Sequence, residues 1–265
     1  MIKLIATDMD GTLLDSSKQL NQEFFTLFEK MKKKEIMFVI ASGNQFYHLY
    51  NQFLPVSDDL YFIAENGCYI TKGKQELVSY CLDNHNVKQV INILNHHLEL
   101  VPMICGKKKS YTFKRYQQYE KTIQNHYDEY AFIQDLQDID DDILKFSIHD
   151  PQHRVVDYVE SIRSQLPPHL KIVTSGNEWM DIQDVNMHKG VGMVFLKNLY
   201  DIQDEECMAF GDQMNDYELL KEVKYSYAMA NAVDSIKDIA YKVILSNEEQ
   251  GVFKKLNEYL EDDSL

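Results

Sequence analysis

Two aspartates separated by one residue follow the first apolar stretch of the chain. Asp8 and Asp10 come directly after residues 3–7, which are mostly apolar. In an extended chain, side chains two positions apart point to the same side. Two carboxylates placed together repel each other unless a cation or a shared proton joins them. The pattern therefore suggests a cation or proton site, although the same residues are also typical of a solvated turn.

A second acidic group follows another apolar stretch in the last third of the chain. Asp212 and Asp216 come after residues 207–210, with Asn215 between the two aspartates. Carboxylate and amide oxygens are the ligands that hard cations such as Mg²⁺ prefer. Asp216 could equally cap the helix that follows it, and this alternative stays open.

Two more polar residues stand at the ends of predicted elements. Ser42 follows the apolar run 36–41, and Lys189 precedes the helix-forming stretch 190–199. Each has an ordinary alternative, because Ser42 could cap a helix and Lys189 could lie on the surface. Their joint occurrence with the aspartates, each at the end of a strand or helix, favours one shared polar site.

Alternating strands and helices would position these residues. Apolar runs predict strands over 3–7, 36–41 and 60–64, and the spacing of apolar residues predicts helices over 22–34 and 46–54. This alternation is typical of βαβ units in a parallel sheet. Ligands of such sheets bind outside the carboxyl ends of the strands. We therefore expect an α/β fold with a Rossmann-like parallel-sheet core.

The segment between residues 83 and 185 has a different character. Its strand-like and helical pieces, including a helix expected over 119–130, form an α+β pattern of roughly 100 residues, which can support a core of its own. We expect an α/β core made of residues 1–82 and 186–265, interrupted by an inserted α+β cap at 83–185. Most aromatic residues of the segment are expected in the cap core: Tyr111, Phe113, Tyr116, Tyr119 and Trp179.

Composition limits the classes of partner. The formal charge of −15, from 42 acidic and 27 basic residues, argues against non-specific nucleic-acid binding. No apolar run reaches the roughly 18 residues of a membrane span. The four cysteines form no C-x-x-C pair and fit a reducing cytoplasm. We expect a cytoplasmic protein with no membrane or nucleic-acid partner, and the sequence leaves its oligomeric state unknown.

The motifs together resemble those of the haloacid dehalogenase superfamily, and more narrowly those of its Cof-type sugar-phosphatase branch. In chain order they are Asp8-Met9-Asp10-Gly11-Thr12-Leu13-Leu14, Ser42-Gly43, His188-Lys189-Gly190 and Gly211-Asp212-Gln213-Met214-Asn215-Asp216. Residues 65–67 and 228–232 also match the branch. The resemblance covers essentially the whole chain, including a cap inserted between the third strand and the lysine motif.

The resemblance implies a Mg²⁺-dependent phosphatase that acts on a small phosphorylated metabolite such as a sugar phosphate. Asp8 would be the nucleophile that forms a phosphoaspartate, and Asp10 would act first as general acid and then as general base. Mg²⁺ would be held by the Asp8 carboxylate, the Asp10 carbonyl and Asp212, with Asp216 in support. The phosphoryl oxygens would be bound by Ser42, Lys189, Asn215 and the backbone amides of Met9 and Gly43.

One residue departs from the branch, and two other functions stay open. Asn44 stands where the branch usually has an arginine, so a neutral amide replaces a guanidinium, and we expect this to change the substrate range but not the core chemistry. The chain could instead be a non-catalytic protein that binds a phosphorylated ligand, or a phosphomutase. The pair Asp8 and Asp10 favours an enzyme, because a binding protein needs no general acid.

Overall fold

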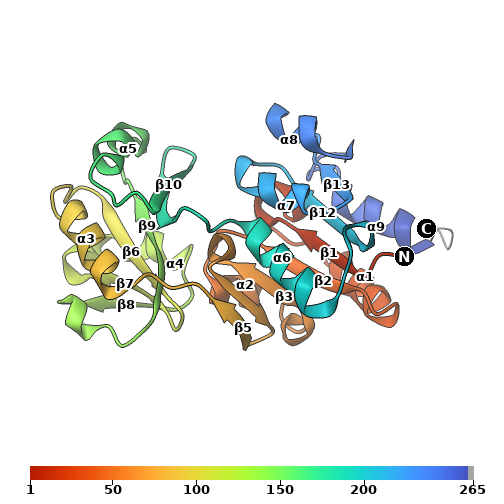
Figure 1. Cartoon of the computed structure of the whole chain (residues 1–265), viewed down its shortest axis with the longest axis horizontal. Coiled ribbons are helices and arrows are strands. Elements are labelled where there is room, and N and C mark those ends of the chain that lie inside the picture. The colour runs from red at the N-terminus through yellow and green to blue at the C-terminus, as the bar shows by residue number, and fades with distance from the viewer. Residues whose placement is uncertain (262–265) are drawn as a thin grey trace. The chain divides into compact units, whose positions relative to one another are not determined.

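The structure, a computed structural model, describes residues 1–261, except for the side chain of Ser175. Its contacts divide the chain into two compact units (Figure 1). Unit 1 consists of Met1–Asn44, Leu49–Val78 and the chain from His188 onward, and unit 2 of Gln45–His48 and Ser79–Met187. The predicted boundaries at 82/83 and 185/186 remain a prediction, because contacts do not show which parts fold independently. In the described part of the chain, no helix is both long and apolar enough to cross a membrane.

Unit 1 is built on an eight-stranded sheet of order β14-β13-β12-β1-β2-β3-β4-β5. From β14 to β3 all neighbouring strands are parallel, whereas β3 and β4 are antiparallel. The strands are β1 (Leu4–Thr7), β2 (Met37–Ala41), β3 (Tyr61–Ala64), β4 (Tyr69–Lys72), β5 (Gln75–Ser79), β12 (Cys207–Gly211), β13 (Tyr225–Ala228) and β14 (Lys242–Val243). The predicted α/β class with a mostly parallel sheet is confirmed.

The central strands are apolar because they are covered on both faces. Every residue of β1, β3 and β12 is buried, as expected for parallel strands between helical layers. The helices of unit 1 are α1 (Glu23–Lys33), α2 (Phe46–Gln52), α6 (Lys189–Tyr200), α7 (Tyr217–Lys221), α8 (Asp234–Ile239) and α9 (Gly251–Glu261), with the first turn of α2 grouped in unit 2. In α1, four residues at helical spacing form the buried stripe: Phe24, Leu27, Phe28 and Met31.

The register of the sheet brings distant segments to one edge. Thr7 at the end of β1 pairs with Phe210 of β12 on one side and with Ile40 of β2 on the other. The residues that follow these three strands therefore leave the sheet at the same edge. This edge carries the first, second and fourth sequence motifs.

Unit 2 has a six-stranded sheet of order β10-β11-β9-β6-β7-β8, antiparallel except for the parallel pair β7–β8. Its strands are β6 (Val101–Gly106), β7 (Ser110–Phe113), β8 (Tyr130–Ile133), β9 (Ile143–His149), β10 (Leu170–Ser175) and β11 (Trp179–Asp184). Its helices are α3 (Asn84–Leu94), α4 (Glu120–Gln124) and α5 (Val156–Arg163). Tyr111, Phe113 and Tyr116 are buried in the main apolar cluster of the unit, as predicted. Tyr119 packs against this cluster, and Trp179 packs against a second, smaller cluster.

The helix expected over 119–130 is wrong in its second half. The helix α4 ends at Gln124, and Tyr130 begins strand β8, which pairs with β7 through Ser110↔Tyr130. Residues 125–129 contain no helix or strand, and at Tyr130 the pairing with a residue 20 positions away replaces the expected helix. The short helix α8 was also absent from the sequence prediction.

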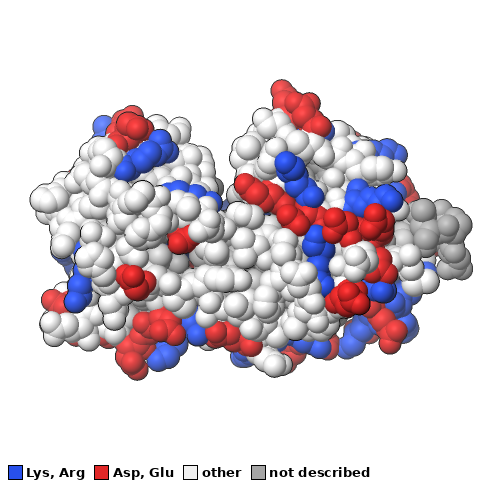
Figure 2. All heavy atoms as spheres, viewed as in Figure 1, with Lys and Arg blue, Asp and Glu red and all other residues white. Residues whose placement is uncertain are grey.

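Charged side chains of both signs lie on the face of the molecule that Figure 2 draws. On the face drawn in Figure 2, Lys and Arg atoms lie in small groups among Asp and Glu atoms.

Candidate active site

Three carboxylates gather at the edge where β1 and β12 end. Asp8, Asp212 and Asp216 each offer a carboxylate oxygen, and these oxygens all lie within 4.8 Å of one another. All three residues are buried. Asp8 follows β1 directly, whereas Asp212 and Asp216 belong to the turn after β12. The parallel pairing of β1 and β12 therefore brings together residues more than 200 positions apart.

Lys189 places its ammonium between two of these carboxylates. Its Nζ donates to Asp8 Oδ1 at 2.5 Å and to Asp216 Oδ1 at 2.6 Å. The Lys189 side chain has no exposed surface, so the alternative of a surface lysine is excluded. The residue is the first of α6, which fixes its backbone beside the carboxylates.

Asp216 binds Lys189 and the turn before α7, whereas its side chain makes no cap hydrogen bond to α7 itself. One carboxylate oxygen accepts the bond from Lys189, and the other accepts the backbone N–H of Asp212 at 2.9 Å and of Gln213 at 3.1 Å. The second oxygen thus caps the turn before α7, together with the Gln213 side chain. Asp216 holds both the lysine and the loop that carries Asp212.

The electrostatics of the cluster reflect an excess of negative charge. Burial raises the pKa of Asp8 well above its ordinary value, and the charge of Asp216 adds to this effect. Burial and Asp216 likewise raise the pKa of Asp212 to about 6. Burial alone would lower the pKa of Lys189, but Asp216 and Asp8 outweigh it and raise that pKa. A single buried ammonium therefore lies among three carboxylates, and burial together with the charge of Asp216 favours the protonated forms of Asp8 and Asp212.

This cluster fits a divalent cation. Three carboxylates and one ammonium carry a net charge of −2 when all are ionised, which a divalent cation offsets. The donor atoms are carboxylate oxygens, the type that Mg²⁺ prefers.

The turn after β1 is shaped to leave room for Asp212. Thr12 Oγ1 donates to Asp212 Oδ1 at 3.0 Å. Gly11 has φ +79°, and a Cβ at this position would lie only 2.4 Å from Asp212 Oδ2. Glycine is therefore required both by the backbone angle and by the close approach of the carboxylate.

The Asp10 carboxylate does not belong to the described three-carboxylate cluster. Strand β1 ends at Thr7, so Asp10 lies in the turn and not in the strand on which the same-side expectation was based. Its side chain is 43% exposed. Asn44 Nδ2 donates to Asp10 Oδ2 at 3.1 Å, and Lys18 Nζ lies 3.6 Å from Asp10 Oδ1.

The other predicted phosphate contacts lie in the loops of the same unit. Ser42 is buried directly after β2, and its Oγ accepts the backbone N–H of Asn44 at 3.1 Å. Met9 is buried between Asp8 and Asp10, Gly43 follows Ser42, and Asn215 is half-buried in the turn before α7. Their contact with a phosphoryl group remains a prediction.

Several structural residues of the site were not singled out from the sequence. Asn231 Nδ2 donates to the Gly11 carbonyl at 2.8 Å, and its Oδ1 accepts the Asn247 N–H at 3.2 Å. Asn247 Nδ2 in turn donates to the Leu14 carbonyl at 2.9 Å. Asn231 lies in the matched stretch 228–232, whereas Asn247 carries no motif signal. These hydrogen bonds stabilise the turn that follows Asp8, since they bind the carbonyls of Gly11 and Leu14.

Comparison with known proteins places this site in a family. The model of the haloacid dehalogenase-like hydrolases matches residues 5–256. The chain is 30% identical to the 5-amino-6-(5-phospho-D-ribitylamino)uracil phosphatase YbjI of Escherichia coli, over 99% of this chain and 98% of that protein. It is 26% identical to the phosphatase of the same description, YitU, from Bacillus subtilis, over 97% of each chain.

A solved structure has the same fold. The crystal structure of SMU.1108c from Streptococcus mutans matches with a TM-score of 0.87 and 28% identity, over 99% of this chain and 100% of that one. The family match, the phosphatases among its relatives and the common fold agree with the motifs at the buried carboxylates. The chain belongs to the haloacid dehalogenase-like hydrolases, as an enzyme of the phosphatase class.

Proposed function

We propose that this enzyme hydrolyses the phosphate monoester of a small metabolite, such as a sugar phosphate, through a phosphoaspartate at Asp8. The observation that carries the proposal is the position of the Asp8 carboxylate. It is buried at the end of β1, and Asp8 Oδ1 lies 2.5 Å from Lys189 Nζ. A nucleophile held against a cation can receive an anionic substrate that a carboxylate alone would repel.

In the first step, an Asp8 carboxylate oxygen forms a bond to phosphorus while the bond from phosphorus to the leaving oxygen breaks. Asp10 gives its proton to that oxygen, so the product leaves as a neutral alcohol. Lys189 and Ser42, with the backbone amides of Met9 and Gly43, would hold the phosphoryl oxygens during the transfer. Asn215 would be an additional polar contact.

In the second step, water attacks the phosphorus of the phosphoaspartate. Asp10 takes a proton from this water as the bond between phosphorus and Asp8 breaks. Inorganic phosphate leaves and the Asp8 carboxylate returns to its starting state. Asp10 loses a proton in the first step and regains one in the second, so it ends the cycle in its starting protonation state.

We further propose that Mg²⁺ is the cofactor, held by the carboxylates of Asp8 and Asp212 and the carbonyl of Asp10. Asp216 would support the site by holding Lys189 and the loop of Asp212. When bound, the ion would offset the repulsion between the anionic nucleophile and the anionic substrate. The three clustered carboxylates support this assignment.

The proposed substrate class is supported by the relatives rather than by the site itself. The Escherichia coli relative is named for a phosphorylated ribitylaminouracil, which is a polyol phosphate joined to a pyrimidine. The 30% identity over nearly the whole chain makes this compound the first substrate to test. Unit 2 is proposed as the cap that selects the leaving group.

The experiment is phosphate release from a panel of phosphorylated metabolites, with Mg²⁺ or with a chelator. The panel includes 5-amino-6-(5-phospho-D-ribitylamino)uracil beside hexose and pentose phosphates. Wild type is compared with Asp8→Asn and with Asp238→Asn, an aspartate on the exposed surface of α8 that serves as a charge-matched control. Release that needs both Mg²⁺ and Asp8, and that Asp238→Asn retains, is the expected result.

Other results point to the alternatives. Release that survives exhaustive chelation would contradict the metal assignment. Binding of phosphorylated compounds without any release would favour a phospho-ligand-binding protein. Conversion of a sugar phosphate to its isomer, with no free phosphate, would favour a phosphomutase.

A further inference from the structure

The Asp10 carboxylate is held by a side chain from another strand end. Asn44 Nδ2 donates to Asp10 Oδ2 at 3.1 Å, although the two residues are 34 positions apart. Because β1 and β2 are parallel neighbours with Thr7 opposite Ile40, the turns after both strands meet at one edge. The contact thus joins two turns whose backbones the sheet fixes.

The Asn44 backbone is itself anchored at both of its polar groups. Its N–H donates to Ser42 Oγ at 3.1 Å, and its carbonyl accepts the Glu65 N–H at 3.2 Å. The loop is also packed closely, since a Cβ on Gly43 would lie 2.9 Å from Asn66 Oδ1. The backbone of Asn44 is therefore fixed, and this limits the positions that its side-chain amide can take beside Asp10.

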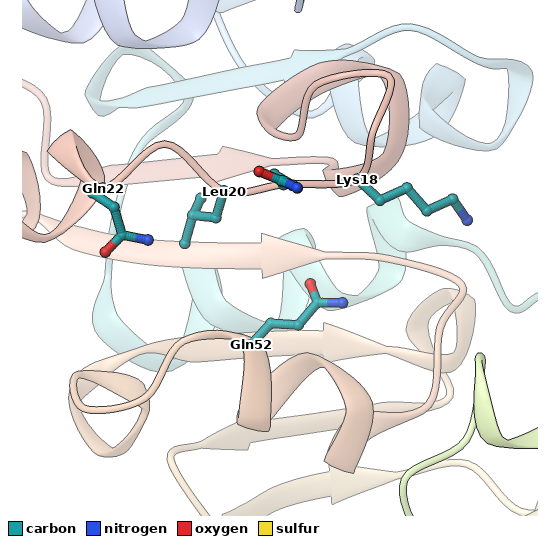
Figure 3. Close-up of a pocket in the computed structure, with 5 residues that line it drawn as sticks. Lys18, Leu20, Gln22 and Gln52 are labelled. Atoms are coloured by element: carbon teal, nitrogen blue, oxygen red, sulfur yellow. The ribbon is translucent and has the colours of Figure 1, made fainter.

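The second described partner of Asp10 is held less firmly. Lys18 Nζ lies 3.6 Å from Asp10 Oδ1, and 65% of the Lys18 side chain is exposed. Figure 3 shows this side chain at one end of a groove of about 360 Å³, pointing away from Gln22 and Gln52. Exposed ion pairs of this kind contribute little, because solvent and salt screen them. Asn44 is the better-anchored partner.

We propose that Asn44 is a positioning residue that orients the Asp10 carboxyl group for proton transfer, an inference that rests on the proposed function. An amide N–H bonded to Oδ2 leaves Oδ1 as the oxygen that carries the proton. Oδ1 then gives this proton to the leaving oxygen as the bond from phosphorus to that oxygen breaks, and the product departs as an alcohol. Asn44 touches neither the phosphorus nor the leaving group in this account.

The proposal predicts a specific dependence on the leaving group. A poor leaving group, such as phenolate, needs the proton of Asp10, whereas 4-nitrophenolate departs readily without it. Loss of the Asn44 amide should therefore slow phenyl phosphate far more than 4-nitrophenyl phosphate. Aryl phosphates of this series have similar shapes, so a lost contact with substrate would lower all of them equally. The value of kcat/KM is the right measure, because it reports only the steps up to leaving-group departure.

The experiment measures kcat/KM for a series of ring-substituted phenyl phosphates with saturating Mg²⁺. The variants are Asn44→Ala, the isosteric Asn44→Asp, Asp10→Asn and the double variant Asn44→Ala with Asp10→Asn. Asn257→Ala is the matched control, because Asn257 Nδ2 donates to Glu23 Oε1 at 2.9 Å in an exposed amide–carboxylate bond between α9 and α1. Circular dichroism checks that each variant is folded.

For Asn44→Ala we expect about a 10- to 100-fold loss on phenyl phosphate and less than about a threefold loss on 4-nitrophenyl phosphate, since general acid catalysis typically contributes about 10²- to 10⁴-fold. Asn44→Asp should steepen the leaving-group dependence at least as much, because it places a carboxylate against Asp10. The Asn44→Ala change should add nothing further in the Asp10→Asn background. Asn257→Ala should match wild type.

Two outcomes would overturn the proposal, and they differ from a failure of the proposed function. An equal loss across the series, or none, for both Asn44 variants would mean that Asn44 does not act through Asp10. The same conclusion would follow if Asn44→Ala increased the leaving-group dependence of kcat/KM as much in the Asp10→Asn background as in the wild-type background. The proposed mechanism itself fails if phosphate release does not depend on Asp8. It also fails if Asp10→Asn leaves the leaving-group dependence of kcat/KM unchanged.

Discussion

Lys189 Nζ lies 2.5 Å from Asp8 Oδ1, and the Lys189 side chain is completely buried. A buried ammonium is stable here only because Asp8 and Asp216 both pair with it. The same contact places a cation beside the carboxylate that we propose as the nucleophile. One side chain thus stabilises the buried cluster and, in the proposed mechanism, binds the phosphoryl group.

Lys189→Met should lower both activity and stability. It removes a cation from the proposed phosphoryl site, and we expect kcat/KM to fall by at least about 100-fold. It also leaves Asp8 and Asp216 without their partner, which should lower the free energy of unfolding of the metal-free protein by about 3–5 kcal/mol. The measurements are phosphatase kinetics with saturating Mg²⁺ and urea denaturation in a chelator.

Lys197→Met is the matched control for this prediction. Lys197 lies on the same helix, and its Nζ contacts Asp204 at 2.8 Å and Glu222 at 3.0 Å. The substitution should reduce stability but keep the wild-type kcat/KM. An equal loss of activity in both variants would show that the effect of Lys189 is only structural.

Gly11→Ala should impair the site by displacing Asp212. The new Cβ would lie 2.4 Å from Asp212 Oδ2 and would sit at φ +79°. We expect a lower Mg²⁺ affinity, measured by calorimetric titration, and a loss of kcat/KM of at least about tenfold, corresponding to about 1.4 kcal/mol. Gly176→Ala is the control, because Gly176 has φ +62° with no atom within 4 Å of the added Cβ. If both variants keep wild-type Mg²⁺ affinity, the close approach at Gly11 does not matter for the site.

His149 should make unit 2 sensitive to acid. Burial lowers the pKa of His149 below its ordinary value of 6.5. Below about pH 6.5 the unfolded state therefore binds more protons than the folded state, and stability falls as the pH decreases. Trp179, the one tryptophan of the chain, has its ring centroid 4.7 Å from that of His149. Its fluorescence thus reports the unfolding of this region.

The measurement is the urea midpoint of Trp179 fluorescence at about pH 7.5 and about pH 5.5, a window on either side of the unfolded-state pKa. Wild type should lose stability at the lower pH, and His149→Gln should lose less. His85→Gln, which removes an exposed histidine at the start of α3, should behave like wild type. Equal losses in all three proteins would contradict the prediction.

The sequence predicted the cluster because its residues stand at the ends of strands and helices. Asp8, Asp212 and Lys189 each follow or begin an element with a clear apolar pattern, and a parallel sheet collects such ends at one edge. The buried contacts among Asp8, Lys189 and Asp216 agree with that expectation. The prediction that Asp216 caps the following helix is wrong, because its side chain makes no cap hydrogen bond to α7 and its second oxygen binds the N–H groups of the preceding turn.

The parts that the sequence did not predict depend on contacts between distant segments. Asn44 was expected to affect the substrate range, yet its amide reaches Asp10, because β1 and β2 are neighbours in the sheet. Asn247 holds the Leu14 carbonyl without any local signal. Strand β8 is missing from the elements that the sequence predicts, and its first residue, Tyr130, falls at the end of the predicted helix, because the pairing with β7 is not visible in the local residues. Local patterns indicate elements, but pairing and side-chain contacts arise from the folded chain.

The central claim is that Asp8 carries the phosphoryl group during turnover. The most direct test is to quench the working enzyme with acid, reduce it with borohydride and sequence the peptide that contains residue 8 by mass spectrometry. Borohydride reduces an acyl phosphate to an alcohol but leaves a free carboxylate unchanged. We predict homoserine at position 8 when substrate and Mg²⁺ are present, and unmodified aspartate when either is omitted. Unmodified Asp8 in an enzyme quenched during rapid turnover, or homoserine at another aspartate, would contradict the account.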